Sequence, residues 1–232
     1  MSTLRRYVVL NNKGGCGKST VATSLAAYYA SQGHQTALFD YDPQGASSQW
    51  LSQRPQHMSP IHGVSASRAS GPTVTRTFLL RVPPGTERSV LDTPVFMARM
   101  DLVELLRTAT ALLVPVMPSV VDTNATARFL RDLTSVVRAI TPGLPVALVG
   151  NRMHPGEESE TEAVKQLANG FQVPLVTCLR ESVSYHTTMG QGVGVHELIT
   201  DEARTDRIQW QPLVDWLEES QSATERPYRQ ST

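Results

Sequence analysis

A glycine-rich turn at residues 11–20 constrains this chain more than any other stretch. It follows the apolar run at residues 7–10 and precedes a helical pattern, so a buried strand should turn into a helix there. Gly14, Gly15 and Gly17 carry no side chains and allow positive φ, so successive backbone N–H groups can point into one anion-sized concavity. We therefore expect this turn to hold phosphate.

Two side chains at the end of the turn suit the same ligand. Lys18 should reach the β- and γ-phosphates of a nucleotide, and the Ser19 hydroxyl should ligate Mg²⁺. The stretch departs from the common phosphate-loop pattern, because Asn12 stands where the first glycine belongs and Lys13 adds a second lysine. A glycine-rich turn also occurs without any ligand, so the rest of the chain has to support this interpretation.

Composition limits the alternatives. The 232 residues are enough for one α/β domain and few for two. Lys plus Arg total 21 and so do Asp plus Glu, so any nucleic-acid binding must come from a local patch. The two cysteines, Cys16 and Cys178, argue against a disulfide framework and against zinc-finger spacing. No stretch approaches the ~20 apolar residues of a membrane span, and we expect a soluble, cytoplasmic protein without a membrane partner.

Strand and helix patterns alternate along the chain. Apolar runs predict strands over residues 36–39, 61–66, 89–91, 111–116, 145–149 and 173–176, and residues 77–82 are apolar enough to pack. Helical spacing predicts helices over residues 19–30, 97–108, 122–140, 157–168 and 182–189, and a last helix in which Pro212 starts the second half. The alternation predicts an α/β fold of the P-loop NTPase type, a doubly wound, mostly parallel sheet with helices on both faces. We expect a single domain over residues 1–219 and a disordered tail over residues 220–232.

Carboxylates follow two of the predicted strands. Asp40 and Asp42 come directly after the strand at residues 36–39, and Asp92 follows the strand at residues 89–91. Ligands usually bind at the carboxyl edge of a parallel sheet, where these side chains should gather near the phosphate turn. An acidic residue at such a strand end can hold a magnesium-bound water.

These motifs resemble those of a known family, the ParA/MinD partition and positioning ATPases. Residues 13–20 look like its deviant Walker A motif, residues 40–45 are similar to its switch I motif, and residues 92–94 to its switch II motif. Residues 179–198 resemble the family's adenine-side loop and helix. The resemblance runs from about residue 6 to residue 218. The family's N-terminal helix-turn-helix extension is missing, which implies a small protein of the ParA type.

The resemblance implies a role for each motif residue. Lys13 is expected to cross to the phosphates of a partner subunit, Asp42 to orient the attacking water, and Lys18 to complete the catalytic set. Mg²⁺ is expected at Ser19, Asp40 and Asp92. The nucleotide is expected to be bound by Gly14, Gly15, Cys16, Gly17, Lys18, Ser19, Thr20, Asn151 and Arg152.

The same resemblance implies a function. ATP binding is expected to assemble a homodimer, the dimer to bind nonspecific DNA on the nucleoid, and a ParB-like or other cargo adaptor to stimulate a weak intrinsic ATPase. Such a cycle would segregate or position a plasmid, a chromosome or a protein organelle. No arginine finger is evident in the motifs, so hydrolysis should be slow without the partner.

Other interpretations remain open from the sequence. A P-loop ligase or kinase acting on a small metabolite, similar to dethiobiotin synthetase, is the alternative function, and Lys13 argues against it. A nitrogenase-iron-protein-like reductase would need cluster cysteines that Cys16 and Cys178 do not supply. The sequence also leaves open which arginines would bind DNA. Arg128, Arg131 and Arg138 share a helix face, although such a face is more often merely solvated. The alternative members of a DNA-binding patch are Arg152, Arg180, Arg204 and Arg207.

Overall fold

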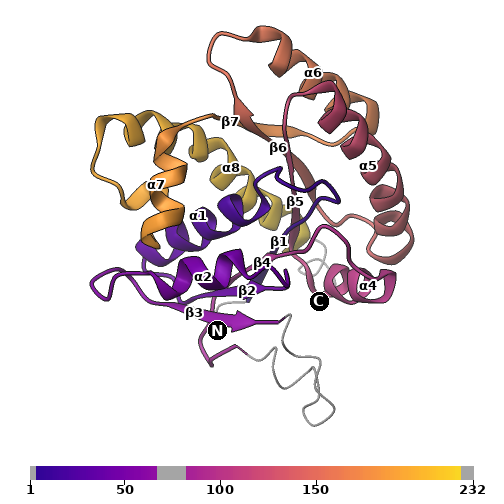
Figure 1. Ribbon diagram of the computed structural model, residues 1–232. Coiled ribbons are helices and arrows are strands. Elements are labelled where there is room, and N and C mark those ends of the chain that lie inside the picture. Colours follow the sequence, from indigo (N-terminus) through magenta and orange to yellow (C-terminus); the bar gives the residue numbers. More distant parts are fainter. Residues whose placement is uncertain (1–3, 67–81, 226–232) are drawn as a thin grey trace.

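The computed structural model describes residues 4–66 and 82–225, with the backbone alone for residues 221–225. In this part of the chain, seven parallel strands form one sheet in the order β3-β2-β4-β1-β5-β6-β7 (Figure 1). The strands are β1 (Arg5–Val9), β2 (Thr36–Asp40), β3 (Ile61–Ser65), β4 (Arg88–Asp92), β5 (Ala111–Val116), β6 (Val146–Met153) and β7 (Leu175–Arg180). The predicted parallel, doubly wound sheet is confirmed.

Helices cover both faces of the sheet (Figure 1). One face carries α1 (Lys18–Ser31), α2 (Ala46–Ser52), α7 (Val183–Gln191) and α8 (Asp201–Glu225), with the short 3₁₀ helix η1 (Val195–Glu197). The other face carries α4 (Arg99–Thr108), α5 (Val120–Ile140) and α6 (Glu158–Phe171). Among the described residues, no helix combines the length and the apolar character that crossing a membrane requires.

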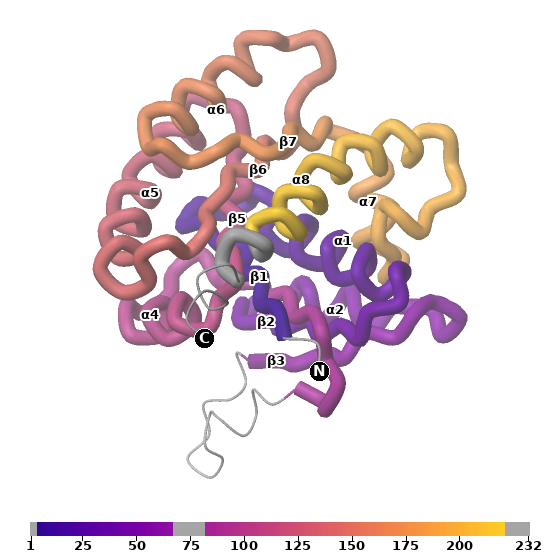
Figure 2. The backbone as a smooth tube through the Cα atoms, turned by 180° about the vertical axis from the view of Figure 1, so that it is seen from behind, coloured from indigo at the N-terminus to yellow at the C-terminus, as the bar shows by residue number. Residues whose placement is uncertain are grey.

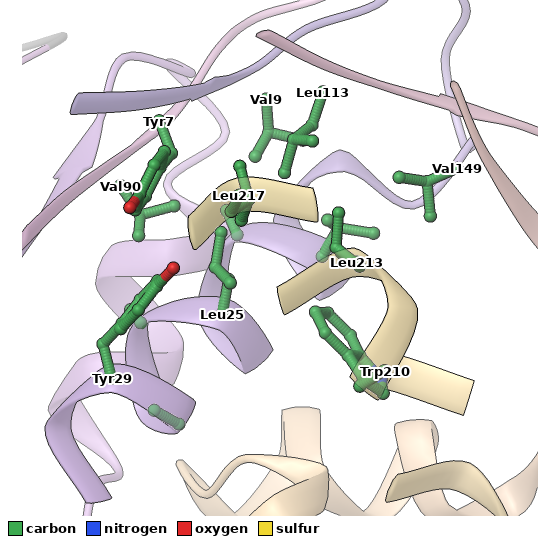
Figure 3. Close-up of a cluster of buried hydrophobic side chains, with 14 of the residues drawn as sticks. Tyr7, Val9, Leu25, Tyr29, Val90, Leu113, Val149, Trp210, Leu213 and Leu217 are labelled. Carbon is green, nitrogen blue, oxygen red and sulfur yellow. The ribbon is translucent and has the colours of Figure 1, made fainter. Parts of the chain in front are cut away.

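The alternation of side chains along the central strand explains why residues 7–10 are all apolar. Tyr7 and Val9 of β1 point into the core under α1 and α8, whereas Val8 and Leu10 point into the core under α4, α5 and α6. Figure 3 shows the first core, where Val9 and the β5 residue Leu113 face the α8 residue Leu213. Removing a fully buried leucine here, by mutation to alanine, would cost roughly 2–5 kcal/mol.

Several predicted boundaries shift, each for a local reason. Helix α5 begins at Val120 rather than at residue 122, because the Ser119 hydroxyl accepts a hydrogen bond from the Asp122 N–H and caps it. The next helix runs past residue 168 to Phe171 and is closed by Gln172 at φ 56°. This delays β7 to Leu175, two residues after the predicted start at residue 173.

The last helix is longer than expected. It begins at Asp201, contains Pro212 within a continuous helix, and runs to Glu225, beyond the predicted domain end at residue 219. Figure 2 shows it on the same face of the sheet as α1 and α7. The remaining tail, residues 226–232, and most of the predicted apolar run at residues 77–82 lie outside the described residues.

The topology places three strand ends together. Strand β1 lies between β4 and β5, and the chain leaves β1 toward β2 on one side and later returns to β5 on the other. Such a reversal of strand order opens a crevice at the carboxyl edge of the sheet. In the parallel register Val9 pairs with Asp92, and Asp92 pairs with Asp40. The glycine-rich turn and both acidic strand ends therefore meet there.

Candidate functional site

The turn between β1 and α1 has the backbone shape that the glycines predict. Gly15 and Gly17 have φ of 76° and 91°, in the left-handed region that favours glycine. Gly17 is the N-cap of α1, and within the part of the chain that the structure describes no side-chain hydrogen bond caps this helix end. These amides and the positive end of the helix dipole are therefore available to an anion, which fits a bound phosphate group.

Two buried amide side chains support the turn from behind. Asn11 donates from Nδ2 to the Pro115 carbonyl at 2.8 Å and to the Thr126 hydroxyl at 3.0 Å. Asn151, at the end of β6, donates from Nδ2 to the Cys16 carbonyl at 2.9 Å. A Cβ on Gly17 would lie 2.0 Å from that Asn151 nitrogen, so both the backbone angle and the packing require glycine there.

The two lysines of the turn have different surroundings. Lys18 is buried, and its Nζ lies 3.2 Å from the Lys13 carbonyl, within the concavity formed by the turn. The Lys13 side chain is about one-third exposed, and its Nζ lies 3.0 Å from Asp122 Oδ1 on α5. The Ser119 hydroxyl donates to the other oxygen of Asp122. Lys13 is thus paired with a carboxylate outside its own turn.

Asp92 is fully buried and has one oxygen without a protein partner. The Ser47 hydroxyl donates to its Oδ2 at 2.7 Å, while Oδ1 has no hydrogen-bond partner among the described residues. Burial raises the pKa of Asp92 to about 6, and the hydroxyl groups of Ser19 and Ser47 lower it in part. A partnerless carboxylate oxygen close to the Ser19 hydroxyl fits a hydrated Mg²⁺, which would favour the charged form.

The neighbouring carboxylates organise the loop after β2. Asp40 accepts hydrogen bonds from the backbone N–H groups of Asp42 at 3.1 Å and Ser48 at 2.7 Å. Asp42 accepts one from the backbone N–H of Gln44 at 2.9 Å and is partly exposed. Both Asp40 oxygens therefore accept hydrogen bonds that shape the loop. Asp40 stabilises this loop beside Asp92 and, unlike Asp92, has no oxygen that lacks a protein partner.

A side pocket lies beside the start of α1. It is a cavity of about 140 Å³ lined by Thr20, Asn151, Arg152, Arg180, Glu181, Ser182, Tyr185, His186 and Met189. Its walls are fixed: the Tyr185 hydroxyl accepts a hydrogen bond from Trp210 Nε1 at 2.9 Å, and Arg180 pairs with Asp206 at 2.6 Å. An aromatic ring, a thioether and several hydrogen-bonding groups suit a planar heterocycle with polar edges.

Large apolar side chains are exposed in the segment that follows β4 and at the start of α5. Phe96 and Met100 are 85% and 84% exposed, and Val120 and Val121 at the start of α5 are 74% and 71% exposed. A cavity of about 540 Å³ separates the segment after β4 from α5 and reaches Asn12 of the turn. Exposed apolar side chains of this size are candidates for an interaction surface.

The structure brings the predicted site residues together. The turn, the acidic strand ends and the predicted pair Asn151 and Arg152 all lie at the carboxyl edge of the sheet. Arg152 has a positive φ of 54° and its side chain is half exposed. Sequence reasoning missed Asn11, Ser47, Asp122 and Tyr185. For Asp122 there was a signal, the Ser119-x-x-Asp122 spacing of a helix cap.

Most of the chain matches the model of a known protein family. Residues 7–194 match the CobQ/CobB/MinD/ParA nucleotide binding domain. The maintenance of carboxysome distribution protein A of Halothiobacillus neapolitanus is 30% identical over 82% of this chain and 86% of its own length. The chromosome-partitioning ATPase Soj of Thermus thermophilus is 27% identical over 81% of this chain and 88% of its own length.

Solved structures share the fold. The apo structure of McdA from Cyanothece matches with a TM-score of 0.71 at 16% identity, covering 94% of this chain and 99% of that one. The cell division protein MinD of Aquifex aeolicus matches with a TM-score of 0.67 at 13% identity, covering 91% and 97%. At these identities the likeness concerns the fold alone, and it agrees with the parallel sheet described above.

Proposed function

The chain belongs to the CobQ/CobB/MinD/ParA family of nucleotide-binding domains, and from this premise we propose that it is an ATP-driven switch that positions a cargo. It is an ATPase of the ParA/MinD positioning type and uses ATP with Mg²⁺. The proposal adds three features to that activity: an ATP-dependent homodimer, binding of the dimer to nonspecific DNA, and stimulation of hydrolysis by a partner protein.

The observation that carries the proposal is the placement of Lys13. Its ammonium lies against Asp122, away from the concavity that Lys18 occupies, although both lysines belong to one turn. A lysine directed out of its own phosphate site can reach the phosphates of a second subunit. Phe96 lines the cavity that reaches Asn12, and Val120 and Val121 directly precede Asp122 in the chain. These exposed apolar side chains would be covered in such a dimer.

The site residues take complementary parts in hydrolysis. The backbone of the turn and Lys18 hold the phosphates, and Asp92 with Ser19 holds the hydrated Mg²⁺. This ion supplies charge neutralisation at the β- and γ-phosphates when it is bound. Asp42 orients the attacking water, and Asp40 holds the backbone that carries Asp42 in place. The adenine base occupies the side pocket beside Asn151 and Arg152.

The DNA surface of this proposal is the exposed face of α5. Arg128, Arg131 and Arg138 are exposed there and form no ion pair with the residues that the structure describes. By contrast, Arg180 pairs with Asp206, and Arg207 donates to the Leu198 carbonyl. Cations without protein partners are better placed to contact phosphates, so the dimer would reside on the nucleoid through this helix.

The small-molecule ligase or kinase stays the second candidate function, and it is the less favoured one. The carboxysome-distribution and chromosome-partitioning relatives cover most of this chain, and the proposal follows their type. A ligase would bind ATP in the same turn but would have no use for Lys13 in a second subunit.

Sedimentation with Mg²⁺ and either ATP or ADP tests the dimer. We expect a dimer with ATP and a monomer with ADP, and Lys13→Ala should stay monomeric with both. Lys165→Ala, on α6, serves as a matched control that should dimerise normally. If the unmodified chain stays monomeric with ATP, the switch is refuted.

A salt series with nonspecific duplex DNA tests the surface. The ATP dimer should bind DNA with an affinity that falls steeply with salt. Replacing Arg128, Arg131 and Arg138 by glutamine should weaken that binding and flatten its salt dependence while ATP-dependent dimerisation is kept. Unchanged DNA binding in the triple variant would exclude α5 as the surface.

A further inference from the structure

Arg54 and Glu197 form a buried ion pair away from the phosphate turn, with both side chains only 5% exposed. Arg54 Nη1 and Nη2 donate to the two carboxylate oxygens of Glu197 at 2.9 and 2.6 Å. The other guanidinium N–H groups donate to the carbonyls of Ser59 and Gly192. All donors of the arginine are therefore used, and Glu197 also accepts the Gly194 N–H at 2.7 Å.

Stability alone does not explain this pair. Desolvating two charges offsets most of their attraction, and apolar side chains of similar volume are often as stabilising. A bidentate, fully hydrogen-bonded pair instead fixes the relative position of the segments that carry it. Here these are the segment that follows α2 and the segment that follows α7.

The two segments are also in direct backbone contact. A Cβ on Gly192 would lie 2.4 Å from the Arg54 backbone nitrogen, so the two backbone segments approach as closely as a glycine permits. The α2 side chain Trp50 is buried and donates from Nε1 to the Val193 carbonyl at 3.2 Å. The C-terminal ends of α2 and α7 are thus clamped together by Arg54 and Glu197, which we call the Arg54–Glu197 clamp.

The opposite end of α2 lies at the acidic strand ends. There the Ser47 hydroxyl donates to Asp92, and the Ser48 N–H donates to Asp40. Helix α7, for its part, contributes Tyr185 and Met189 to the side pocket. One short helix therefore connects the carboxylates of Asp40 and Asp92 to the helix that lines the pocket (Figure 1).

We propose that Arg54 and Glu197 are positioning residues that couple occupation of the side pocket by a nucleobase to the conformation of the loop at residues 40–48. This inference rests on the proposed function only in taking the ligand to be an adenine nucleotide. A base in the pocket contacts α7, the clamp fixes the end of α7 to α2, and α2 presents Ser47 and Ser48 to the carboxylates. A phosphate ligand without a base lacks the contacts that favour one loop arrangement.

Amide hydrogen exchange, followed by mass spectrometry, separates the contributions of base and phosphate. The unmodified protein is compared with Mg²⁺ and saturating ADP, and with Mg²⁺ and saturating pyrophosphate. Both ligands should slow exchange at residues 11–20. ADP should slow exchange at residues 40–48 at least about fivefold more than pyrophosphate, a typical size for coupling between two sites. Equal protection at residues 40–48 by the two ligands would overturn the coupling.

The double variant Arg54→Met with Glu197→Leu tests the route. It replaces the clamp by apolar side chains, so cooperative thermal unfolding is expected to remain. The difference between ADP and pyrophosphate at residues 40–48 should fall below about twofold, while protection at residues 11–20 stays. Arg5→Met, which removes an ion pair between β1 and α8, is the control and should keep the full difference. If the double variant does not fold, Glu197→Gln allows the same comparison.

The outcomes separate this inference from the proposed function. A double variant that folds and still distinguishes the two ligands refutes the clamp, whatever the protein does with ATP or DNA. A chain that does not dimerise with ATP refutes the switch but leaves the exchange comparison valid, because ADP and pyrophosphate do not require a dimer. Lack of protection at residues 11–20 by both ligands refutes the two proposals together.

Discussion

The ammonium of Lys13 lies 3.0 Å from Oδ1 of Asp122 in the same chain, so the one lysine proposed to act in a partner subunit is already paired within its own. Asp122 is almost buried and is held by the Ser119 hydroxyl. This ion pair must break before Lys13 can reach the phosphates of a second subunit, so it opposes dimerisation.

Asp122→Asn should therefore strengthen the ATP dimer. The pair is partly exposed, so its loss is worth at most about 1 kcal/mol in each subunit, or roughly 30-fold in the dissociation constant of a dimer in which both pairs break. Sedimentation equilibrium with ATP and Mg²⁺ measures this change. Asp132→Asn, an exposed carboxylate on the same helix, should leave the constant unchanged. A weaker dimer in Asp122→Asn would mean that Asp122 contributes to the interface itself.

Asp42→Ala should uncouple binding from hydrolysis. Among the described residues, its carboxylate accepts a hydrogen bond only from a backbone N–H in the loop, so nucleotide affinity should change little. Steady-state turnover should fall at least ~100-fold if this carboxylate acts on the attacking water. Phosphate release is the measurement, and Asp215→Ala on α8 is the control. If hydrolysis is slowed as expected, the proposed ATP dimer and its DNA complex should persist longer in Asp42→Ala than in the unmodified protein. Normal turnover in Asp42→Ala would remove Asp42 from the catalytic set.

Asp92 makes the stability of the nucleotide-free protein depend on pH. Its pKa is raised to about 6 by burial, so the folded protein keeps this proton to a higher pH than the unfolded chain does. The carboxyl's contribution is therefore present at low pH and is lost as pH rises from about 4 to about 6, by up to about 3 kcal/mol.

Asp92→Asn should remove that loss. Thermal unfolding at pH 7.5 without ligand should occur at a higher temperature in Asp92→Asn than in the unmodified chain, and the two should converge near pH 4. The variant should also lose the stabilisation that Mg²⁺ adds to ADP. If the variant is less stable than the unmodified protein at pH 7.5, the buried carboxylate is not a source of strain.

Asn151 should contribute to the binding of phosphate ligands that carry no base. Its Nδ2 is bonded to the Cys16 carbonyl, so it supports the phosphate turn as well as lining the pocket. Asn151→Ala should weaken pyrophosphate binding about tenfold, which is the loss expected for one buried hydrogen bond of 1–2 kcal/mol. Calorimetric titration with pyrophosphate and with ADP measures this. A variant that loses affinity for ADP alone would restrict Asn151 to reading the adenine.

Much of the fold could be predicted because its signals are local. Gly15 and Gly17 permit the left-handed backbone that the structure shows, and the apolar run of β1 predicts a strand buried on both faces. Asp40 and Asp92 each follow a strand pattern directly, so their place at one edge of a parallel sheet needs only the topology. Helix ends were predicted less well, because the Ser119 cap and the Gln172 turn are decided by single hydrogen bonds and backbone angles.

The sequence by itself determined the sheet, the phosphate turn and the acidic strand ends, since periodicity and glycine placement act within a few residues of chain. Only the tertiary structure decided what each of these groups touches. Asn11 meets Thr126, Ser47 meets Asp92, and Arg54 meets Glu197 across separations of 115, 45 and 143 residues. No local pattern encodes such partners, because their distance depends on how the helices pack on the sheet. Lys13 stood out in the sequence, but only the fold placed Asp122 beside it.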